Sequence, residues 1–260
     1  MMSIAMPQLS AGRPLEDPLA ATFDTDAFTK AVLSTTQSMA AACELVLVSS
    51  DLSAEDVTAA CELAARYPLA CVTVNPFWIG LAHSVLSGTG ICVGAVAGSP
   101  GGATLTHNKR DETDTAVRLG AREITTSMQL GALKGRDFTV VRSDLAAVVD
   151  VAHGAGALVT ATIEAHRLSI EEKLRAAEIC LAAEVDFLAP ESTRGGCGDT
   201  LDISLFRGVA GAQCGIKTYQ PVSTRTEAVE RLRAGASRLG GARILELLSG
   251  YEGEATCWPR

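Results

Sequence analysis

The sequence predicts a single (β/α)8 TIM barrel preceded by an N-terminal helical extension. Short apolar segments alternate with amphipathic, helix-like segments through almost the whole chain, and a length of 260 residues is typical of such a barrel. Strands that alternate with helices pair in parallel, and eight such units can close on themselves. The alternative is an open doubly wound sheet, which usually carries a glycine-rich turn after its first strand; Ser49-Ser50-Asp51-Leu52 contains no glycine.

The expected strands are short, apolar and bounded by polar turns. They are residues 45–48, 70–74, 91–97, 123–128, 158–163, 186–188, 215–218 and 238–240. The expected helices are residues 54–67, 77–86, 110–119, 138–155, 170–183, 203–210 and 227–234. Ser53 and Ser169 each precede acidic residues, a pattern that indicates helix N-termini.

The chain divides into an extension, a barrel and a tail. Residues 1–43 form the extension: the first twenty contain Pro, Ser and Gly and are expected to be disordered or to lie on the surface, and residues 26–43 have a helical pattern. Residues 44–249 form the barrel. Residues 250–260 have no periodicity and are expected to fray.

Composition excludes several classes of partner. A net charge of −8 argues against a nucleic-acid or anionic-membrane surface, and no apolar run reaches the roughly 18 residues that span a bilayer. The first seven residues do not resemble a secretory signal, so we expect a cytoplasmic protein. The eight cysteines are scattered, with no C-x-x-C pair and no histidine at zinc spacing. We therefore expect core thiols, no metal and no cofactor.

Lys217 is the lysine most indicative of chemistry. Lys30, Lys109, Lys134 and Lys173 lie among polar neighbours and are expected to be hydrated. Lys217 instead lies in the strand-like run Cys214-Gly215-Ile216-Lys217-Thr218-Tyr219. A lysine buried at a strand end loses hydration and its pKa falls, so it can act as a nucleophile, a proton carrier or an anion anchor.

Side-chain alternation predicts a polar barrel mouth. In a (β/α)8 barrel the active site gathers at the C-terminal ends of the strands, and residues two apart share a face. An inward Lys217 therefore places Tyr219 inward as well. Two neighbouring strands direct polar groups to the same mouth: Thr125, Ser127 and Gln129 from one, Thr160, Thr162 and Glu164 from the other. Thr125 and Thr160 could equally bond each other's hydroxyl in the barrel core and have no role in binding substrate. An inward Glu164 is different, because a buried carboxylate needs a partner or a role.

Several motifs resemble the deoxyribose-phosphate aldolase family over roughly residues 45–247. They occur in the family's order and nearly its spacing: Val74-Asn75-Pro76-Phe77, Gly98-Ser99-Pro100-Gly101-Gly102-Ala103-Thr104, Leu130-Gly131-Ala132-Leu133-Lys134, Ile163-Glu164, Asp186-Phe187, Gly215-Ile216-Lys217 and Gly235-Ala236-Ser237-Arg238-Leu239-Gly240. The resemblance implies a (β/α)8 class I aldolase and a homodimer.

The resemblance also implies a changed active site. The family's sixth strand carries the lysine that forms a Schiff base with substrate, and Ala189 stands at that position. Thr125 stands at the family's proton-moving aspartate, and Thr160 at its fifth-strand lysine. Lys217 matches the family's second lysine, on the seventh strand.

The expected phosphate site differs too. Gln220-Pro221 replaces the family's glycine pair after the seventh strand, and Pro221 has no N–H to donate. Gly240 and Gly241 still leave room for an anion, and Arg243 could supply a positive charge. The loop 194–198 offers a further anion clamp or a lid, with Cys197 as a thiol to test.

Two functions remain open from the sequence. The first is a divergent aldolase-type enzyme, a carbon–carbon lyase or a related isomerase or cyclase, acting on a small carbonyl compound that is neutral or anionic. In it Lys217 forms an imine, or acts as a charged donor paired with Glu164, and Glu164 or Glu191 is the acid or base. Substrate would be bound by residues that line the mouth: Asn75, Thr125, Ser127, Thr160, Thr162, Tyr219, Gln220, Gly240, Gly241 and Arg243. The alternative is a catalytically inactive barrel that binds a ligand or a partner protein.

Overall fold

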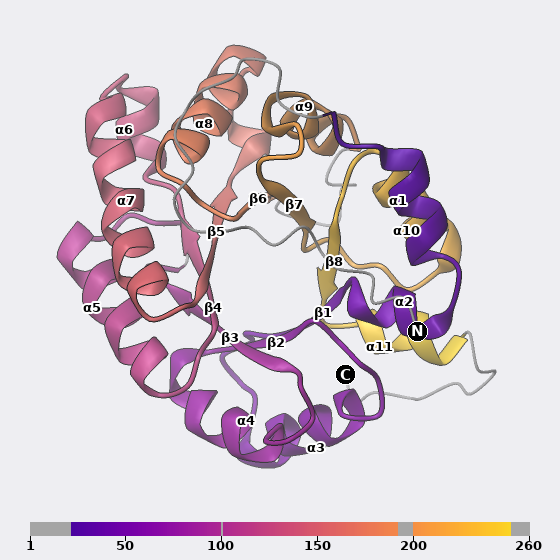
Figure 1. Cartoon of the computed structure of the whole chain (residues 1–260). Helices are drawn as coiled ribbons and strands as arrows, with labels where there is room; N and C mark the ends of the chain where they lie inside the picture. Colours follow the sequence, from indigo (N-terminus) through magenta and orange to yellow (C-terminus); the bar gives the residue numbers. More distant parts are fainter. Residues whose placement is uncertain (1–21, 100, 192–199, 251–260) are drawn as a thin grey trace.

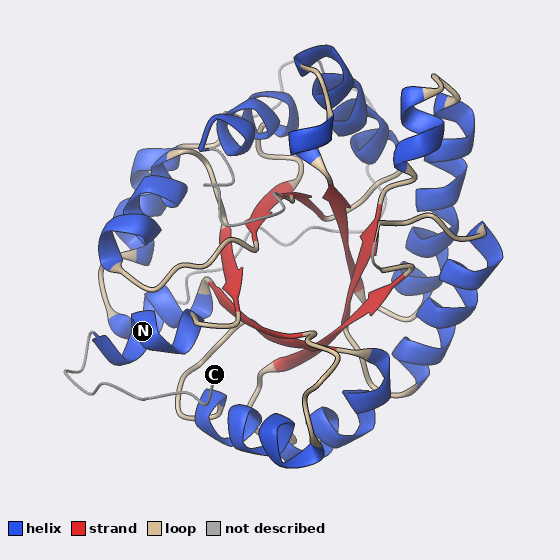
Figure 2. Ribbon diagram, turned by 180° about the vertical axis from the view of Figure 1, so that it is seen from behind, coloured by secondary structure: helices blue, strands red, loops and turns tan. Residues whose placement is uncertain are grey.

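Eight parallel strands close into one barrel with helices around it. The structure, a computed structural model, describes residues 22–99, 101–191 and 200–250. Each strand pairs with its neighbour in sequence, and β8 closes the ring on β1 (Figures 1 and 2). The predicted (β/α)8 barrel is confirmed.

All eight expected strands are present, with shifts of one or two residues at their ends. They are β1 (Cys43–Leu47), β2 (Cys71–Val74), β3 (Cys92–Ala97), β4 (Glu123–Ser127), β5 (Leu158–Ile163), β6 (Phe187–Pro190), β7 (Gly215–Thr218) and β8 (Arg238–Gly241). The largest shifts are two residues: β6 ends two residues later than expected, and β1 begins two residues earlier and so includes Glu44.

The helices surround the barrel in chain order. They are α1 (Thr25–Val32), α2 (Thr36–Ala41), α3 (Ala54–Ala64), the 3-10 turn η1 (Pro76–Trp78), α4 (Ile79–Val85), α5 (Thr106–Arg118), α6 (Leu130–Lys134), α7 (Phe138–Gly154), the 3-10 turn η2 (Ala165–Arg167), α8 (Ile170–Ala182), α9 (Thr200–Ala210), α10 (Arg225–Arg233) and α11 (Ile244–Gly250). The helical patterns at 26–43 and 77–86 each divide into two elements. In the first, Thr35 is extended and its side chain accepts a hydrogen bond from Ser38 N, which starts α2 afresh.

Reciprocal caps fix three of the helix starts. Ser53 and Ser169 each accept a backbone N–H three residues on, and the acid at that position accepts the N–H of the serine in return. Thr224 makes the same arrangement at α10. The two serine N-termini predicted from the sequence are confirmed, and such caps stabilise a helix by about 1 kcal/mol.

The two N-terminal helices pack on the barrel's outer ring. Helix α1 contacts α10, and α2 contacts β1 and α11, on the side where the chain closes (Figure 1). Near them, the guanidinium of Arg207 lies 3.9 Å from the ring centre of Phe23 and donates to the carbonyls of Gly235 and Cys214. A cation stacked on an aromatic ring helps to hold this extension in place.

The strands separate an apolar outer layer from a polar interior. Leu45, Val72, Ile124, Leu188 and Ile216 face the helices and are fully buried in the aliphatic core. Because neighbouring residues on a strand face opposite ways, the residues between them line the inside of the barrel. That inner face carries charged and hydroxyl side chains.

Lys109 is buried, and its expected hydration is wrong. Its Nζ donates to Asp144 Oδ2 at 2.6 Å and to Ser127 O at 2.8 Å, and its side chain has no exposed surface. Thr106 donates to the other oxygen of Asp144. The lysine stem lies against Gly98, where φ is +64° and a Cβ would approach Lys109 Cγ to 2.7 Å. The residue thus joins α5 and α7 to the end of β4.

Other expectations concern membranes and regions beyond the described chain. Every helix within the described residues is too short or too polar to cross a membrane. The expectations for residues 1–20, the 194–198 loop and most of the tail lie outside the described residues.

Replacing Lys109 with Met should lower the free energy of unfolding by about 3–5 kcal/mol, because Asp144 would remain buried without a cation. Chemical denaturation followed by circular dichroism measures the change. Lys30→Met removes an exposed lysine and should change stability by about 0.5 kcal/mol or less. Adding Asp144→Leu to Lys109→Met should recover part of the lost stability. Equal losses of stability in the Lys30 and Lys109 variants would contradict a buried Lys109–Asp144 ion pair.

Candidate active site

Lys217 projects into the barrel and bonds two carboxylates. Its Nζ lies 2.8 Å from Glu44 Oε2 on β1 and 2.5 Å from Glu123 Oε2 on β4. The Lys217 and Glu44 side chains have no exposed surface, and that of Glu123 is 5% exposed. The barrel therefore holds its lysine as a fully compensated ion pair rather than as a free amine.

Arg238 completes a charge cluster on the same face. Its Nη1 donates to Glu123 Oε1 at 2.7 Å and lies 3.9 Å from Glu44 Oε2. The ring of Phe187 on β6 lies beside both cations, with its centre 4.7 Å from Lys217 Nζ and 5.0 Å from Arg238 Cζ. Two carboxylates and two cations balance one another inside the barrel, and the ring adds cation–π attraction.

The cluster keeps Lys217 protonated. Burial alone would lower the pKa of Lys217, but the charges of Glu123 and Glu44 outweigh it and raise the pKa well above its usual value. Burial alone would raise the pKa of Glu123, but the charges of Lys217 and Arg238 outweigh burial and lower that pKa. The expectation that burial lowers the pKa of Lys217 is wrong, because the sequence did not reveal its two carboxylate partners. A protonated amine is a poor nucleophile and a good hydrogen-bond donor.

Tyr219 lies between this cluster and the barrel mouth. Its hydroxyl is 3.2 Å from Thr125 Oγ1 and 3.4 Å from Glu44 Oε1. Its ring covers Gly240, where an added Cβ would lie 2.6 Å from the ring. Burial, together with the charge of Glu44, raises the pKa of Tyr219, so the phenol stays protonated. Alternation from Lys217 correctly placed Tyr219 on the inner face.

The end of the neighbouring strand β6 carries a carboxyl group with a raised pKa. Thr162 on β5 donates to Ser127 Oγ at 3.1 Å and also bonds the Glu191 side chain. Burial raises the pKa of Glu191 against the effect of Thr162, and the charge of Glu164 raises it further. Glu191 directly follows β6, at the strand ends where barrel active sites form.

Other predicted site residues have partners away from Lys217. Glu164 pairs with Arg167 at 2.7 Å, so the suggested pairing of Glu164 with Lys217 is wrong. Arg243 makes two bonds to Glu246 on the outside. Three remaining positions lie near strand ends: Asn75 donates to Ser49 O, Gln220 is buried after β7, and Gly241 ends β8. Thr160 is buried in the middle of β5.

The sequence interpretation missed Glu44, Glu123 and Arg238. A signal existed for one of them: Glu123 lies two residues before Thr125 on a predicted strand and so shares its face. Glu44 directly precedes the expected first strand, which began at residue 45, and Arg238 was placed on a strand without a role. Their grouping depends on barrel closure, which joins β1, β4, β7 and β8 around one interior.

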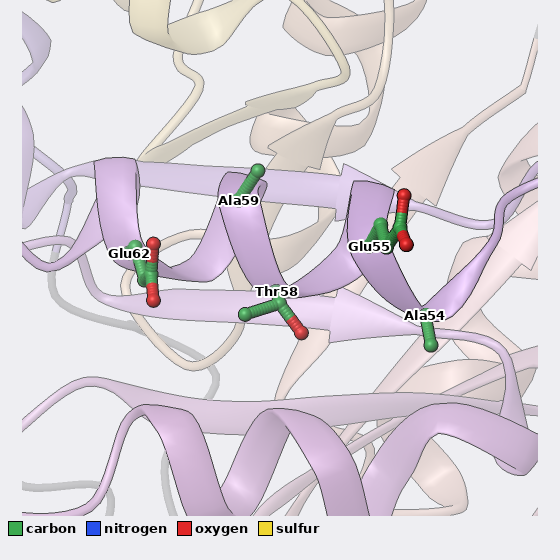
Figure 3. A pocket seen from close by; sticks show the side chains of 5 residues that line it. All are labelled: Ala54, Glu55, Thr58, Ala59 and Glu62. Carbon is green, nitrogen blue, oxygen red and sulfur yellow. The ribbon is translucent and has the colours of Figure 1, made fainter.

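Two surface hollows lie outside the barrel and away from this cluster. One runs along the outer face of α3, where Figure 3 shows its lining side chains: Ala54, Glu55, Thr58, Ala59 and Glu62. The other lies between η1, α4 and α5. Neither includes a residue of the inner face, so the strand ends remain the candidate active site.

Comparisons with known proteins identify the family. No family model matches the chain. A deoxyribose-phosphate aldolase of Aciduliprofundum boonei is 37% identical over 199 residues, which cover 76% of this chain and 90% of the relative. Its counterpart in Thermococcus kodakarensis is 36% identical over 203 residues, covering 77% and 91%. The chain belongs to the deoxyribose-phosphate aldolase family.

Solved structures agree on the fold of this aldolase-family chain. The deoxyribose phosphate aldolase of Aeropyrum pernix, described as a tetramer, superposes with a TM-score of 0.79 at 20% identity, over 88% of this chain and 97% of that one. An aldolase named QR15 superposes with a TM-score of 0.76 at 24% identity, over 82% and 96%. At these identities the superpositions support the barrel alone.

Glu123→Gln should lower the free energy of unfolding at pH 7 by about 3 kcal/mol, since Arg238 and Lys217 lose a buried partner. The folded-state pKa of Glu123 is depressed, so its stabilisation is present above the usual 4.5 and is lost as pH falls towards the folded pKa. Below pH 4.5 the unmodified protein should lose up to about 1.4 kcal/mol more per pH unit than the variant.

Urea denaturation across pH measures both effects. Glu164→Gln, which breaks a partly exposed pair, is the matched control and should cost at most about 1 kcal/mol. Parallel pH profiles for the Glu123 variant and the unmodified protein would contradict the buried ion pair.

Proposed function

We propose that the chain is an aldolase-type carbon–carbon lyase that acts on a small carbonyl compound at the barrel mouth without an imine intermediate. The observation that carries the proposal is the Tyr219 hydroxyl, which links the protonated Lys217 cluster through Glu44 to the mouth. Val46 and Val96, the second-last residues of β1 and β3, are partly exposed, which supports an opening at this level. Membership of the aldolase family supports the reaction class.

Tyr219 and Glu191 can divide the chemistry of a retro-aldol cleavage. The Glu191 carboxylate takes the proton of the substrate's β-hydroxyl, the bond between the α and β carbons breaks, and its electron pair forms an enolate. Tyr219 turns its O–H from the 3.4 Å bond with Glu44 to the enolate oxygen, and the cation of Lys217 stabilises the charge from below. Glu191 then returns its proton to the carbon. A carboxyl group with a raised pKa suits both steps near neutral pH.

An uncharged substrate fits this mouth better than a phosphorylated one. Arg243, the predicted anion clamp, is engaged by both oxygens of Glu246. Gly240 is covered by the Tyr219 ring, and Pro221 offers no N–H. Deoxyribose 5-phosphate, the substrate class suggested by the relatives' name, is therefore not our proposed substrate.

Ala189 supports a route without an imine. Phe187 faces the interior, so Ala189, two residues further along β6, faces it as well and lies nearer the mouth. In the resembled family this position carries the Schiff-base lysine. A methyl group there leaves Lys217 as the inward lysine of this region, and Lys217 is held by two carboxylates.

A catalytically inactive, ligand-binding barrel is the second candidate. The full burial of Lys217 favours it, because a ligand at the mouth would not contact the amine directly. Turnover separates the two candidates: a screen of β-hydroxy aldehydes and ketones that gives binding but no cleavage favours the second.

Borohydride added with acetaldehyde should leave no reduced adduct on Lys217 of the unmodified protein. Ala189→Lys should gain a trapped adduct at position 189, since burial and the nearby Lys217 charge favour the neutral amine. Peptide mass spectrometry locates the adduct, and Ala189→Met controls for size. An adduct on Lys217 of the unmodified protein would show that Lys217 itself forms the imine.

Tyr219→Phe should lower kcat on any substrate found in the screen by about 10²–10³-fold with little change in KM, because its hydrogen bond forms to the transition state. Steady-state kinetics measures the split. Tyr67→Phe, after α3, is the control and should leave both constants unchanged. Glu191→Gln should abolish the turnover. Full activity of the Tyr219 variant would exclude it from the reaction.

A further inference from the structure

A second polar group lies at the opposite end of the barrel interior from the mouth. Cys71, Cys92 and Glu123 are the first residues of β2, β3 and β4. Cys71 and Cys92 are register partners on adjacent strands and both are free thiols, and the Cys71 sulfur lies 3.7 Å from Thr73 Oγ1. Within the described part of the chain, these are the three side chains of metal-binding type whose ligand atoms converge, all within 4.8 Å of one another.

We propose that Cys71, Cys92 and Glu123 form a binding site for a thiophilic divalent metal ion such as Zn²⁺. Two sulfurs and a carboxylate oxygen are ligands that zinc favours, and three protein ligands leave a fourth position for water. In a tetrahedral site with Zn–S bonds of about 2.3 Å, the two sulfurs lie about 3.8 Å apart. The ligand atoms therefore need to move by about 1 Å at most.

Charge balance supports the site despite two nearby cations. Lys217 and Arg238 already bond Glu123, which would repel an added dication. Binding, however, removes one proton from each thiol: Zn²⁺ plus two Cys–SH gives a Zn(S)₂ unit and two released protons, with no added net charge. Each oxygen of Glu123 keeps a lone pair beside its bond to a cation.

Access is available from the same end. Cys71 is fully buried and forms the inner wall, whereas Cys92 is partly exposed. Burial and the neighbouring thiol and carboxylates raise the pKa of Cys71. Without metal Cys71 therefore stays a thiol, and metal uptake must displace its proton. The site does not depend on the proposed reaction, because its cysteines lie away from the mouth.

Titration of the reduced, metal-free protein with Zn²⁺ in a calorimeter tests the proposal. We expect one equivalent to bind, with an apparent affinity that rises about 100-fold per pH unit because two protons leave. Cys71→Ala and Cys92→Ala should each abolish binding, and Cys61→Ala, which removes a buried cysteine of α3, should retain it. Absence of stoichiometric binding, or its retention in both variants, would overturn the site.

Two measurements on the unmodified protein avoid the risk that a variant misfolds. Co²⁺ should give intense thiolate-to-metal charge-transfer absorption, which oxygen ligands do not produce. Zn²⁺ should slow alkylation of Cys92 by iodoacetamide at least tenfold, read by peptide mass spectrometry. Unchanged alkylation would refute the proposal. The proposal would also be refuted if Cys71 and Cys92 form a disulfide and the protein, once that disulfide is reduced, binds no metal.

Discussion

The interior of this barrel is organised around one buried cation, the ammonium group of Lys217, whose charge other residues must balance. Lys217 has no contact with solvent, and an isolated buried cation would cost several kcal/mol. Glu44 on β1 and Glu123 on β4 supply the opposing charge, and Arg238 on β8 balances the second negative charge through its bond to Glu123. One inward lysine on β7 therefore requires charged residues on three other strands, where an aliphatic barrel would place branched apolar side chains.

The same compensation limits what the site can do. An amine held by two carboxylates stays protonated and contributes a fixed positive charge, whereas a Schiff-base lysine must lose its proton. In the function that we propose, reactivity therefore lies with groups that reach the mouth. Tyr219 contacts the cluster through Glu44, and Glu191, at the end of the neighbouring strand, has a raised pKa. In this proposal the chain keeps Lys217, which matches the family's second lysine, while the reaction depends on Tyr219 and Glu191.

The sequence predicted the barrel because the signals for strands and caps are local. Alternating patterns located all eight strands, and Ser53 and Ser169 identified helix starts from their own next three residues. Alternation also placed Tyr219 on the face of Lys217. The partners of Lys217 lie 173 and 94 positions away, and no local pattern relates them. Burial was correctly inferred for Lys217, but the direction of its pKa shift required those partners, and Lys109 resembled a surface lysine because Asp144 lies 35 positions on.

Glu123 connects the two ends of the interior. Its carboxylate bonds Lys217 and Arg238 and also lies within reach of the Cys71–Cys92 pair. If a metal drew one of its oxygens away, Lys217 would rely more on Glu44, the carboxylate that Tyr219 contacts. Tyr219 would then share Glu44 with an ammonium group of Lys217 that has lost part of its bond to Glu123. The strength of the hydrogen bond that Tyr219 offers at the mouth would change. Metal binding at the cysteine end would thus be linked to chemistry at the mouth through two carboxylates and one lysine.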